Sequence, residues 1–334
     1  MNNTPPIIYV DMDNVLVDFP SAFKHYDPQY LDTIDDKDEI DGIFSKMEPM
    51  QHAIAAVEFL ATHFDVFILS TAPWNNPSAW TDKLNWIKKY LPEVCHKKLI
   101  LSHNKQLNIG DYLIDDRLKN GVIGFKGEHI HFGTGNFPDW KSVIKYLIKK
   151  ENINLKNFTF ENKDTTLLYL GGINGTRDST TYTALKKHCK NIAYISYDKK
   201  NVELAKTQIE NEVVEAQKKY KNVLLCGNSL GGYWANYFSE QFHIPCLLIN
   251  PSLNPKANLE KYGFGKNMLS SFKESTFYYK NKIALLGKND DVVNNKLNAQ
   301  KLNDIESIVW VDEGHRLLSY DVLIELIIYK LIFF

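Results

Sequence analysis

The 334-residue sequence has little of what would place it in a specialised class of protein. It contains only four cysteines, at positions 95, 189, 226 and 246, and none of them forms a C-x-x-C pair. This spacing argues against a zinc site or a disulfide framework, so we expect reduced, mostly buried thiols. A formal net charge of -1 argues against general electrostatic binding to nucleic acid or to a membrane surface.

Long hydrophobic runs and a leader pattern are also missing. The opening MNNTPP lacks the basic residues and the long apolar core of a signal peptide, and the most apolar late segment, residues 323–334, is too short to span a bilayer. We therefore expect a cytoplasmic protein that acts on small molecules, with no nucleic-acid partner and no membrane partner. Hydrophobic residues at 44% and charged residues at 24% are ordinary, and the length suits two domains with separate cores.

The most informative stretch lies near the N-terminus, in the run IIYVDMDNV. Its first four residues predict a short buried strand, which leads directly into Asp11 and Asp13. Open α/β sheets bind ligands at the carboxyl ends of their strands, so these two acids can converge on one small volume. Acids that close repel each other unless a cation or a shared proton relieves them. Taken alone, they could also be solvated loop carboxylates.

Three further predicted strands in the first half also end on polar side chains. They are residues 65–69 followed by Thr71, residues 98–101 followed by Lys105, and residues 112–114 followed by Asp115 and Asp116. Singly, each has a structural explanation: a threonine bonded to backbone, a surface lysine, an acidic turn. The alternation of strands with helices predicts a mostly parallel, doubly wound α/β sheet.

One of the predicted helices spans residues 78–90, where Trp80, Leu84 and Ile87 recur at helical spacing. We expect these three side chains to lie in the core. The acidic run from Asp35 to Asp41 is typical of a solvated face.

The strand ends thus carry an Asp pair, a Thr, a Lys and a second Asp pair, an order that resembles the signature of the haloacid-dehalogenase-like (HAD-like) phosphatases. More narrowly, the runs TAPWNNPSAWTDKLNWIKKYLP, LILSHNK, GDYLIDDR and HIHFGTGNFPDWKSVIKYL resemble the cytosolic 5'(3')-deoxyribonucleotidases. The resemblance covers residues 6–148. It implies a Rossmann-like phosphatase domain with a small helical cap, which we place at residues 1–150.

This resemblance implies a role for each residue. Asp11 would be the nucleophile that becomes an aspartyl-phosphate, and Asp13 the acid that protonates the leaving alkoxide and later activates water. Thr71 would donate to a phosphoryl oxygen, and Lys105 would neutralise charge developing on the phosphoryl group. The implied Mg²⁺ ligands are Asp11, Asp13 (through its carbonyl), Asp116 and, less directly, Asp115, and the implied substrate-binding residues are Phe19 and Ala72. Phe19 would stack on the base or only pack the cap.

A polar segment rich in Asn and Lys then predicts a linker, residues 151–164, before a second domain at residues 165–334. In that second domain, a strand at residues 222–226 runs into Gly-Asn-Ser-Leu-Gly, centred on Ser229, and then into a helix. Strand, sharp turn and helix are the structural context of the G-x-S-x-G nucleophile elbow.

Later strand ends supply the partners of this serine. Asp290 and Asp291 follow a predicted strand at residues 283–286, and His315 follows another at residues 308–311. Serine, acid and histidine is the chain order of the α/β-hydrolases. We predict Ser229 as nucleophile, His315 as base and Asp290, with Asp291 as its rival, as the residue that orients the imidazole.

The run LGGING after the first strand of this half predicts an oxyanion hole formed by the backbone amides of Ile173 and Leu230. The motifs YLGGINGT, LLCGNSLGGYWA, LINPSLNP, LLGKNDDVV and VDEGHRL resemble the YqiA-type small esterases of bacteria, compact α/β-hydrolases with a minimal lid. In this chain Gly171 stands where that family often has a histidine.

Together, the two resemblances imply a bifunctional hydrolase. One half would be an Mg²⁺-dependent phosphomonoesterase of (deoxy)ribonucleoside monophosphates, and the other a carboxylester or thioester hydrolase. Three alternatives stay open: one half is only a binding or dimerisation module, the phosphatase acts on a sugar phosphate or another small phosphometabolite, or both halves act on one metabolite. A homodimer also stays open.

Overall fold

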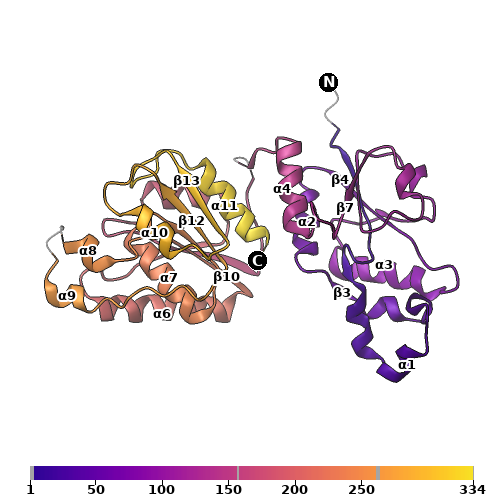
Figure 1. Ribbon diagram of the computed structural model, residues 1–334, viewed down its shortest axis with the longest axis horizontal. Coiled ribbons are helices and arrows are strands. Elements are labelled where there is room, and N and C mark those ends of the chain that lie inside the picture. The colour runs from indigo at the N-terminus through magenta and orange to yellow at the C-terminus, as the bar shows by residue number, and fades with distance from the viewer. Residues whose placement is uncertain (1–3, 156–157, 261–263, 334) are drawn as a thin grey trace. The chain divides into compact units, whose positions relative to one another are not determined.

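The computed structural model describes residues 4–155, 158–260 and 264–333, and the chain divides into two compact units between Ile153 and Asn154 (Figure 1). Each unit is built around its own parallel β-sheet with helices packed against it. The fold is therefore α/β in both halves, as the alternation of strands and helices predicts.

In the first unit, a five-stranded sheet has the order β5-β4-β1-β6-β7, and all neighbouring strands are parallel. The strands are β1 (Ile7–Val10), β4 (Asp65–Ser70), β5 (Leu99–Leu101), β6 (Tyr112–Asp115) and β7 (Glu128–His131). The first strand of the chain is central, with Val10 opposite Ile68 on one side and Ile114 on the other. The carboxyl ends of β1, β4 and β6 therefore meet at one edge of the sheet.

The helices of this unit are α2 (Ala53–Leu60), α3 (Ser78–Tyr90) and α4 (Trp140–Lys150), with short 3-10 helices η4 (Lys105–Leu107) and η5 (Val122–Gly124). The prediction for the inner face of α3 is wrong at two of three positions. Ile87 is buried, but Trp80 and Leu84 are 45% and 41% exposed. The helix instead buries Ala79, Lys83 and Trp86 together with Ile87. The face that packs inward is therefore not the one that carries Trp80 and Leu84.

A small cap is inserted between β1 and α2. The two-residue strands β2 (Val17–Asp18) and β3 (Glu48–Pro49) pair antiparallel at its base. Four short helices connect them: η1 (Phe19–His25), α1 (Pro28–Asp32), η2 (Lys37–Glu39) and η3 (Ile43–Lys46). Asp27 caps α1 by accepting a hydrogen bond from the backbone of Gln29, and Pro28 occupies the first helical position, where no donor is needed.

In the second unit, a six-stranded parallel sheet has the order β13-β12-β11-β10-β8-β9. The strands are β8 (Thr165–Leu170), β9 (Ile192–Ile195), β10 (Asn222–Asn228), β11 (Cys246–Ile249), β12 (Lys282–Gly287) and β13 (Ser307–Val311). The sequence patterns leave β11 unassigned. It is short and follows α7 after a connection of only a few residues.

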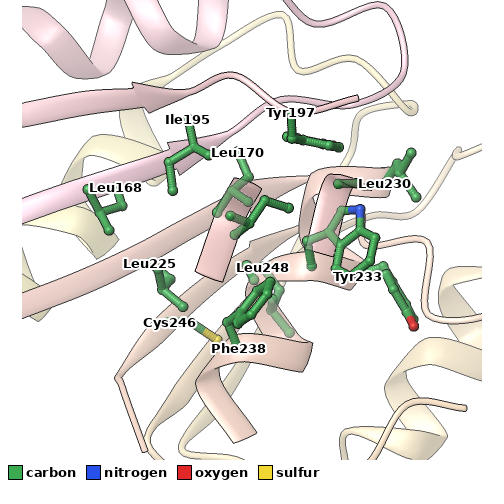
Figure 2. Packing of buried hydrophobic residues seen from close by; sticks show 14 of the residues in the cluster. Leu168, Leu170, Ile195, Tyr197, Leu225, Leu230, Tyr233, Phe238, Cys246 and Leu248 are labelled. Atoms are coloured by element: carbon green, nitrogen blue, oxygen red, sulfur yellow. The ribbon is translucent and has the colours of Figure 1, made fainter. Parts of the chain in front are cut away.

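Helices cover both faces of this second sheet. They are α5 (Thr180–His188), α6 (Val202–Lys219), α7 (Leu230–Phe242), α8 (Pro255–Glu260), α9 (Lys266–Ser270), α10 (Asn295–Lys301) and α11 (Asp321–Ile332). Buried side chains of α6 and α7 share one core with the sheet, and those of α5 and α11 share another. Figure 2 shows Leu225 and Leu248 of the central strands packed against Phe238 of α7. Burying apolar area of this kind holds α7, and therefore its N-terminus, firmly against β10.

The four cysteines are buried free thiols, as predicted. Within the described ranges, no helix combines the length and the apolar character needed to cross a membrane.

Candidate active sites

The first candidate site is a cavity of about 330 Å³ at the carboxyl edge of the first sheet. The predicted residues Asp11, Asp13, Thr71, Lys105 and Asp115 all line it, although they come from loops far apart in the chain. Parallel strands in register explain this convergence, because their carboxyl ends open toward the same side.

The loop after β1 aims both acids into this cavity. Asn14 adopts a left-handed backbone conformation with φ of 58°, and the N–H groups of Leu16 and Val17 donate to the carbonyl of Met12 at 2.9 Å each. The indole Nε1 of Trp140 donates to the carbonyl of Val15 at 2.8 Å and anchors the loop to α4. The tight turn reverses the chain toward the cap and leaves the two carboxylates on one side.

Lys105 bridges the two predicted Asp pairs. Its Nζ lies 2.9 Å from Asp11 Oδ1 and 2.5 Å from Asp115 Oδ2, and the side chain is almost completely buried. Burial by itself lowers the pKa of Lys105, but the charges of Asp11 and Asp115 outweigh it and the pKa ends up raised. The lysine is therefore held as a cation against the site.

Asp11, Asp115 and Asp116 each offer an oxygen, and the three oxygens lie within 4.8 Å of one another. Asp11 Oδ1 has only its ion pair with Lys105, and the buried Asp116 Oδ1 has no hydrogen-bond partner. Burial and the charge of Asp11 raise the pKa of Asp116 and raise that of Asp115 to about 6. Unsatisfied buried carboxylate oxygens are costly, and hard divalent cations prefer oxygen ligands, so this donor set fits Mg²⁺.

A lysine that the sequence patterns did not single out holds the other acid. Lys83 is fully buried on α3, with its Nζ 2.7 and 2.6 Å from the two oxygens of Asp13 and 3.0 Å from Ser70 Oγ. The ring of Phe44, from the cap, lies 4.5 Å from the same Nζ. Burial raises the pKa of Asp13, and Lys83 partly offsets this. The sequence offered one signal that Lys83 is buried. Lys83 lies four residues from both Ala79 and Ile87, which puts it on the buried face of α3.

The other predicted residues are placed less directly. Thr71 lines the cavity, but its Oγ1 donates to the carbonyl of Ser102 at 3.0 Å. Phe19 lines the cavity together with Phe23 and Phe44. Ala72 is fully buried and does not line it, because its neighbours Thr71 and Pro73 face the opening instead.

Charged side chains outside the predicted set complete the cavity wall. Arg117 and Lys119 follow the second Asp pair, and Lys37 comes from the cap. Asp35, Asp36 and Asp38 also line the cavity, so the acidic run is more than a solvated face. Asn76, just after Thr71, is almost fully buried and donates to the carbonyls of Asp38 and Ile40 at 2.8 and 2.9 Å, which holds this cap segment over the cavity.

The second candidate site begins at Ser229, between β10 and α7. Ser229 has φ of 56° and ψ of -118°, a strained conformation typical of a nucleophile elbow. The flanking glycines allow the sharp turn. A Cβ on Gly231 would lie 2.0 Å from the carbonyl oxygen of Leu170, and one on Gly227 would lie 2.2 Å from that of Gly231. Both positions therefore require glycine.

The predicted acid–base pair is assembled. His315 Nδ1 and Asp290 Oδ2 are 2.8 Å apart, so the histidine pairs with Asp290 rather than with Asp291. The backbone N–H groups of Val292 and Val293 donate to the other carboxylate oxygen. Although burial raises the pKa of Asp290, these hydrogen bonds and His315 leave it lowered, so the carboxyl stays ionised. The contacts among the described residues include no hydrogen bond between Ser229 Oγ and the His315 ring.

Asn250, at the end of β11, ties the loops of this site together. It is fully buried, and its Nδ2 donates to the carbonyls of Gly314 and His315 at 3.1 and 3.0 Å. Its Oδ1 accepts from Gly287 N at 2.7 Å and from Asn295 Nδ2 at 2.8 Å. Asn295 Nδ2 also lies 3.2 Å from Asp290 Oδ2. Asn250 is a polar residue directly after an apolar run, a pattern that could have indicated a site residue at a strand end. The sequence predictions did not include it.

The two predicted sources of oxyanion-hole amides, Leu230 and the loop after β8, are both next to the serine. Leu230 is the first residue of α7, so its N–H has no intrahelical acceptor. In the loop after β8, a Cβ on Gly172 would lie 3.1 Å from Ser229 Cβ, so the backbone of Gly172 lies against the serine. Ile173, the predicted donor, follows one residue later and packs its side chain partly against the core.

Comparisons with known proteins divide along the same boundary. Residues 21–138 match the family described as "5' nucleotidase, deoxy (Pyrimidine), cytosolic type C protein", a range that begins after Asp11 and Asp13. Residues 166–285 match "Uncharacterised protein family (UPF0227)".

Among individual proteins, a predicted 5'(3')-deoxyribonucleotidase of Vibrio phage KVP40 is 56% identical over 150 residues, which cover 42% of this chain and 84% of the phage protein. The 5'(3')-deoxyribonucleotidase of Bacillus subtilis is 27% identical over 146 residues, covering 38% of this chain and 84% of that protein. The solved structure of Est1E from Butyrivibrio proteoclasticus aligns at 12% identity with a TM-score of 0.42, covering 51% of this chain and 88% of Est1E.

The chain therefore carries a deoxyribonucleotidase-type phosphatase unit, which makes it a hydrolase, followed by a second α/β unit that is built on a parallel sheet and matches the UPF0227 family.

Proposed function

Because the chain belongs, through its N-terminal unit, to the family of 5'(3')-deoxyribonucleotidases, we propose that this unit hydrolyses (deoxy)ribonucleoside monophosphates. We place the phosphatase domain at residues 1–150, the linker at residues 151–164 and the hydrolase domain at residues 165–334. The observation that carries the proposal is the bridge of Lys105 between Asp11 and Asp115, beside the buried Asp116 Oδ1, which has no hydrogen-bond partner.

The proposed reaction has two steps. Asp11 attacks the phosphorus, the bond to the sugar oxygen breaks, and Asp13 gives that oxygen its proton. Water then attacks the aspartyl-phosphate, Asp13 takes the proton from this water, and the bond between Asp11 and phosphorus breaks to release phosphate. Lys105 neutralises the phosphoryl charge, while Lys83 holds the Asp13 carboxyl in place.

The carboxylates of Asp11 and Asp116, with the backbone carbonyl of Asp13, would hold Mg²⁺, and Asp115 supports them through Lys105. This ion would let an anionic nucleophile approach an anionic phosphate. We expect hydrolysis of p-nitrophenyl phosphate to require Mg²⁺ and to stop on chelation. Assays of nucleoside monophosphates beside sugar phosphates then identify the substrate class. Faster hydrolysis of sugar phosphates would overturn the nucleotide assignment.

For the C-terminal unit we propose a carboxylester or thioester hydrolase. Ser229 attacks the acyl carbonyl while His315 takes its proton, and His315 then protonates the leaving group, so that an acyl-serine remains. Water, activated by His315, releases the acid. The strained serine turn and the His315–Asp290 pair support this proposal. Active-site hydrogen bonds are often long or absent without substrate, so a rotation of the Ser229 side chain would complete the relay.

Hydrolysis of p-nitrophenyl butyrate, with thioesters as a second substrate class, tests the second activity. A wild-type protein that hydrolyses phosphate esters but neither acyl substrate would favour the alternative in which the C-terminal unit is a binding or dimerisation module. The reverse result would favour the same alternative for the N-terminal unit.

A further inference from the structure

We propose that Lys199 forms, with the loop at residues 171–175, a subsite for an anionic group, a carboxylate or a phosphate, on the substrate of the Ser229 site. The inference rests on the proposed hydrolase function of the C-terminal unit. It goes further by assigning the substrate a negative charge.

The position of Lys199 follows from the sheet. β9 lies beside β8, with Ile195 opposite Leu170, so the segments that follow both strands leave the same edge. The first segment holds the oxyanion loop, and the second holds Tyr197 and Lys199. Figure 2 shows Tyr197 beyond Leu170 and Ile195 at this end of the strands.

Lys199 contacts the oxyanion loop directly. Its Nζ donates to the carbonyl of Gly171 at 3.2 Å and lies 3.1 Å from the centroid of the Tyr197 ring. The Tyr197 hydroxyl donates to the same carbonyl at 2.6 Å. Gly172, the next residue, lies against the serine, since a Cβ there would be 3.6 Å from Ser229 Oγ. With ordinary peptide dimensions, the ammonium is within about 11 Å of the nucleophile.

Lys199 is half-buried, and within the described ranges it differs from the four buried lysines in having no acidic partner. Lys83 pairs with Asp13, Lys105 with Asp11 and Asp115, Lys282 with Glu240, and Lys330 with Glu306. For Lys199, no carboxylate of the described residues lies within 4.0 Å of Nζ. The neighbouring Asp198 directs its Oδ1 to the backbone N–H groups of Lys200 and Asn201 instead.

Without a counter-ion, the charged form of Lys199 is less stable than it would be beside a carboxylate. Burial lowers the pKa of Lys199 to about 7, because the partly desolvated ammonium is not compensated. An anion placed beside it would favour the charged form and regain the lost interaction. The four buried lysines of the described chain each have a counter-ion within the protein, so we assign the counter-ion of Lys199 to the substrate.

The experiment compares two esters with the same leaving group and acyl length. Mono-p-nitrophenyl glutarate carries a terminal carboxylate, and p-nitrophenyl valerate does not. Because a hydrogen bond to a charged group is stronger than one between neutral groups, we expect the full-length protein to prefer the glutarate ester in kcat/KM by at least about tenfold. Lys199→Met should remove this preference, so that the ratio of the two kcat/KM values approaches one, and Lys199→Arg should retain most of it. Lys200→Met, at the exposed neighbouring position, is the matched control.

Inhibition of valerate hydrolysis distinguishes the two anion sources. If glutarate is the stronger competitive inhibitor, the anionic group of the substrate is a carboxylate. If inorganic phosphate is the stronger one, that group is a phosphate. In both cases the inhibition should be weaker in Lys199→Met. Equal preference in wild type and Lys199→Met would overturn the subsite while leaving the hydrolase intact. If neither ester is hydrolysed, the hydrolase proposal fails, and calorimetry of glutarate binding to wild type and Lys199→Met decides the subsite alone: equal binding refutes it.

Discussion

The two candidate sites hold their reactive side chains in place by different interactions, charged groups in the N-terminal unit and neutral amide hydrogen bonds in the C-terminal unit. The site of the N-terminal unit concentrates charge: Asp11, Asp115 and Asp116 share one small volume, and Lys105 and Lys83 enter it from different elements. The site of the C-terminal unit pairs His315 with Asp290 on a neutral amide framework around Asn250. Repulsion among carboxylates demands a cation, whereas a satisfied amide network needs none.

This difference matches the chemistry that each site would perform. Phosphoryl transfer brings more negative charge into a site, so positive groups and a metal must already be balanced against acids there. Acyl transfer starts from a neutral carbonyl, and exact placement of one serine and one histidine suffices. Five predictions test the contrast, beginning with the largest effect.

Asp11→Asn should remove the phosphatase activity, lowering kcat by about 10⁴-fold or more, because the nucleophile is lost. Ester hydrolysis by the same variant should stay at the wild-type level, as measured with p-nitrophenyl phosphate and p-nitrophenyl butyrate in parallel. Asp65→Asn, a half-exposed partner of Lys98 at the opposite end of β4, serves as the control. Residual phosphatase activity near that of wild type would exclude Asp11 as the nucleophile.

Ser229→Ala should lower acyl-ester hydrolysis by about 10³-fold or more and leave Mg²⁺-dependent phosphate release unchanged. Ser270→Ala, at an exposed position, should change neither rate. Loss of both activities in Ser229→Ala would mean that the two sites are coupled, contrary to the separation proposed here.

Lys83→Met should affect substrates according to their leaving group. Without Lys83, the Asp13 carboxyl loses the ion pair that positions it toward the leaving oxygen, which should cost about 10²-fold in kcat on a nucleoside monophosphate. p-Nitrophenyl phosphate should lose much less, because its leaving group departs without protonation. A purely structural role for Lys83 would lower both rates equally. Lys88→Met, exposed on the same helix, is the control.

Asn250→Leu should destabilise the C-terminal unit by about 3 kcal/mol, because buried partners at Gly287, Gly314 and His315 lose their hydrogen bonds. Chemical denaturation followed in parallel with both activities measures the effect. Phosphatase activity should survive to the denaturant concentration that wild type tolerates. An unchanged unfolding midpoint for ester hydrolysis would show that the amide framework is dispensable.

Magnesium should stabilise the N-terminal unit less as the pH falls. Since the pKa of Asp115 is raised to about 6, its carboxyl is ionised above that pH and takes up a proton below it. In the metal-free protein this uptake stabilises the fold as the pH falls, because the folded state binds the proton more tightly than the unfolded chain. The rise in melting temperature on adding saturating Mg²⁺ should therefore be larger at pH 7.5 than at pH 5. An equal rise at both values would remove Asp115 from the cation site.

The sequence by itself determined what depends on local pattern. A strand followed by Asp-x-Asp, and a strand followed by G-x-S-x-G and a helix, indicate both folds and the two candidate nucleophiles, because hydrophobic periodicity and turn residues are local features of about a dozen residues. Parallel strand ends must meet at one edge, so the convergence of Asp11, Lys105 and Asp115 could also be foreseen.

Only the tertiary structure decided which polar groups are buried and what they face. Trp80 fits the helical pattern better than Lys83, yet the cap and the sheet leave the tryptophan half exposed and enclose the lysine beside Asp13. Asn250 and Lys199 likewise look like ordinary loop residues until neighbouring strands bring Gly314 and Gly171 to them. The free energy of a buried polar group depends on partners distant in the chain, and no local pattern records them.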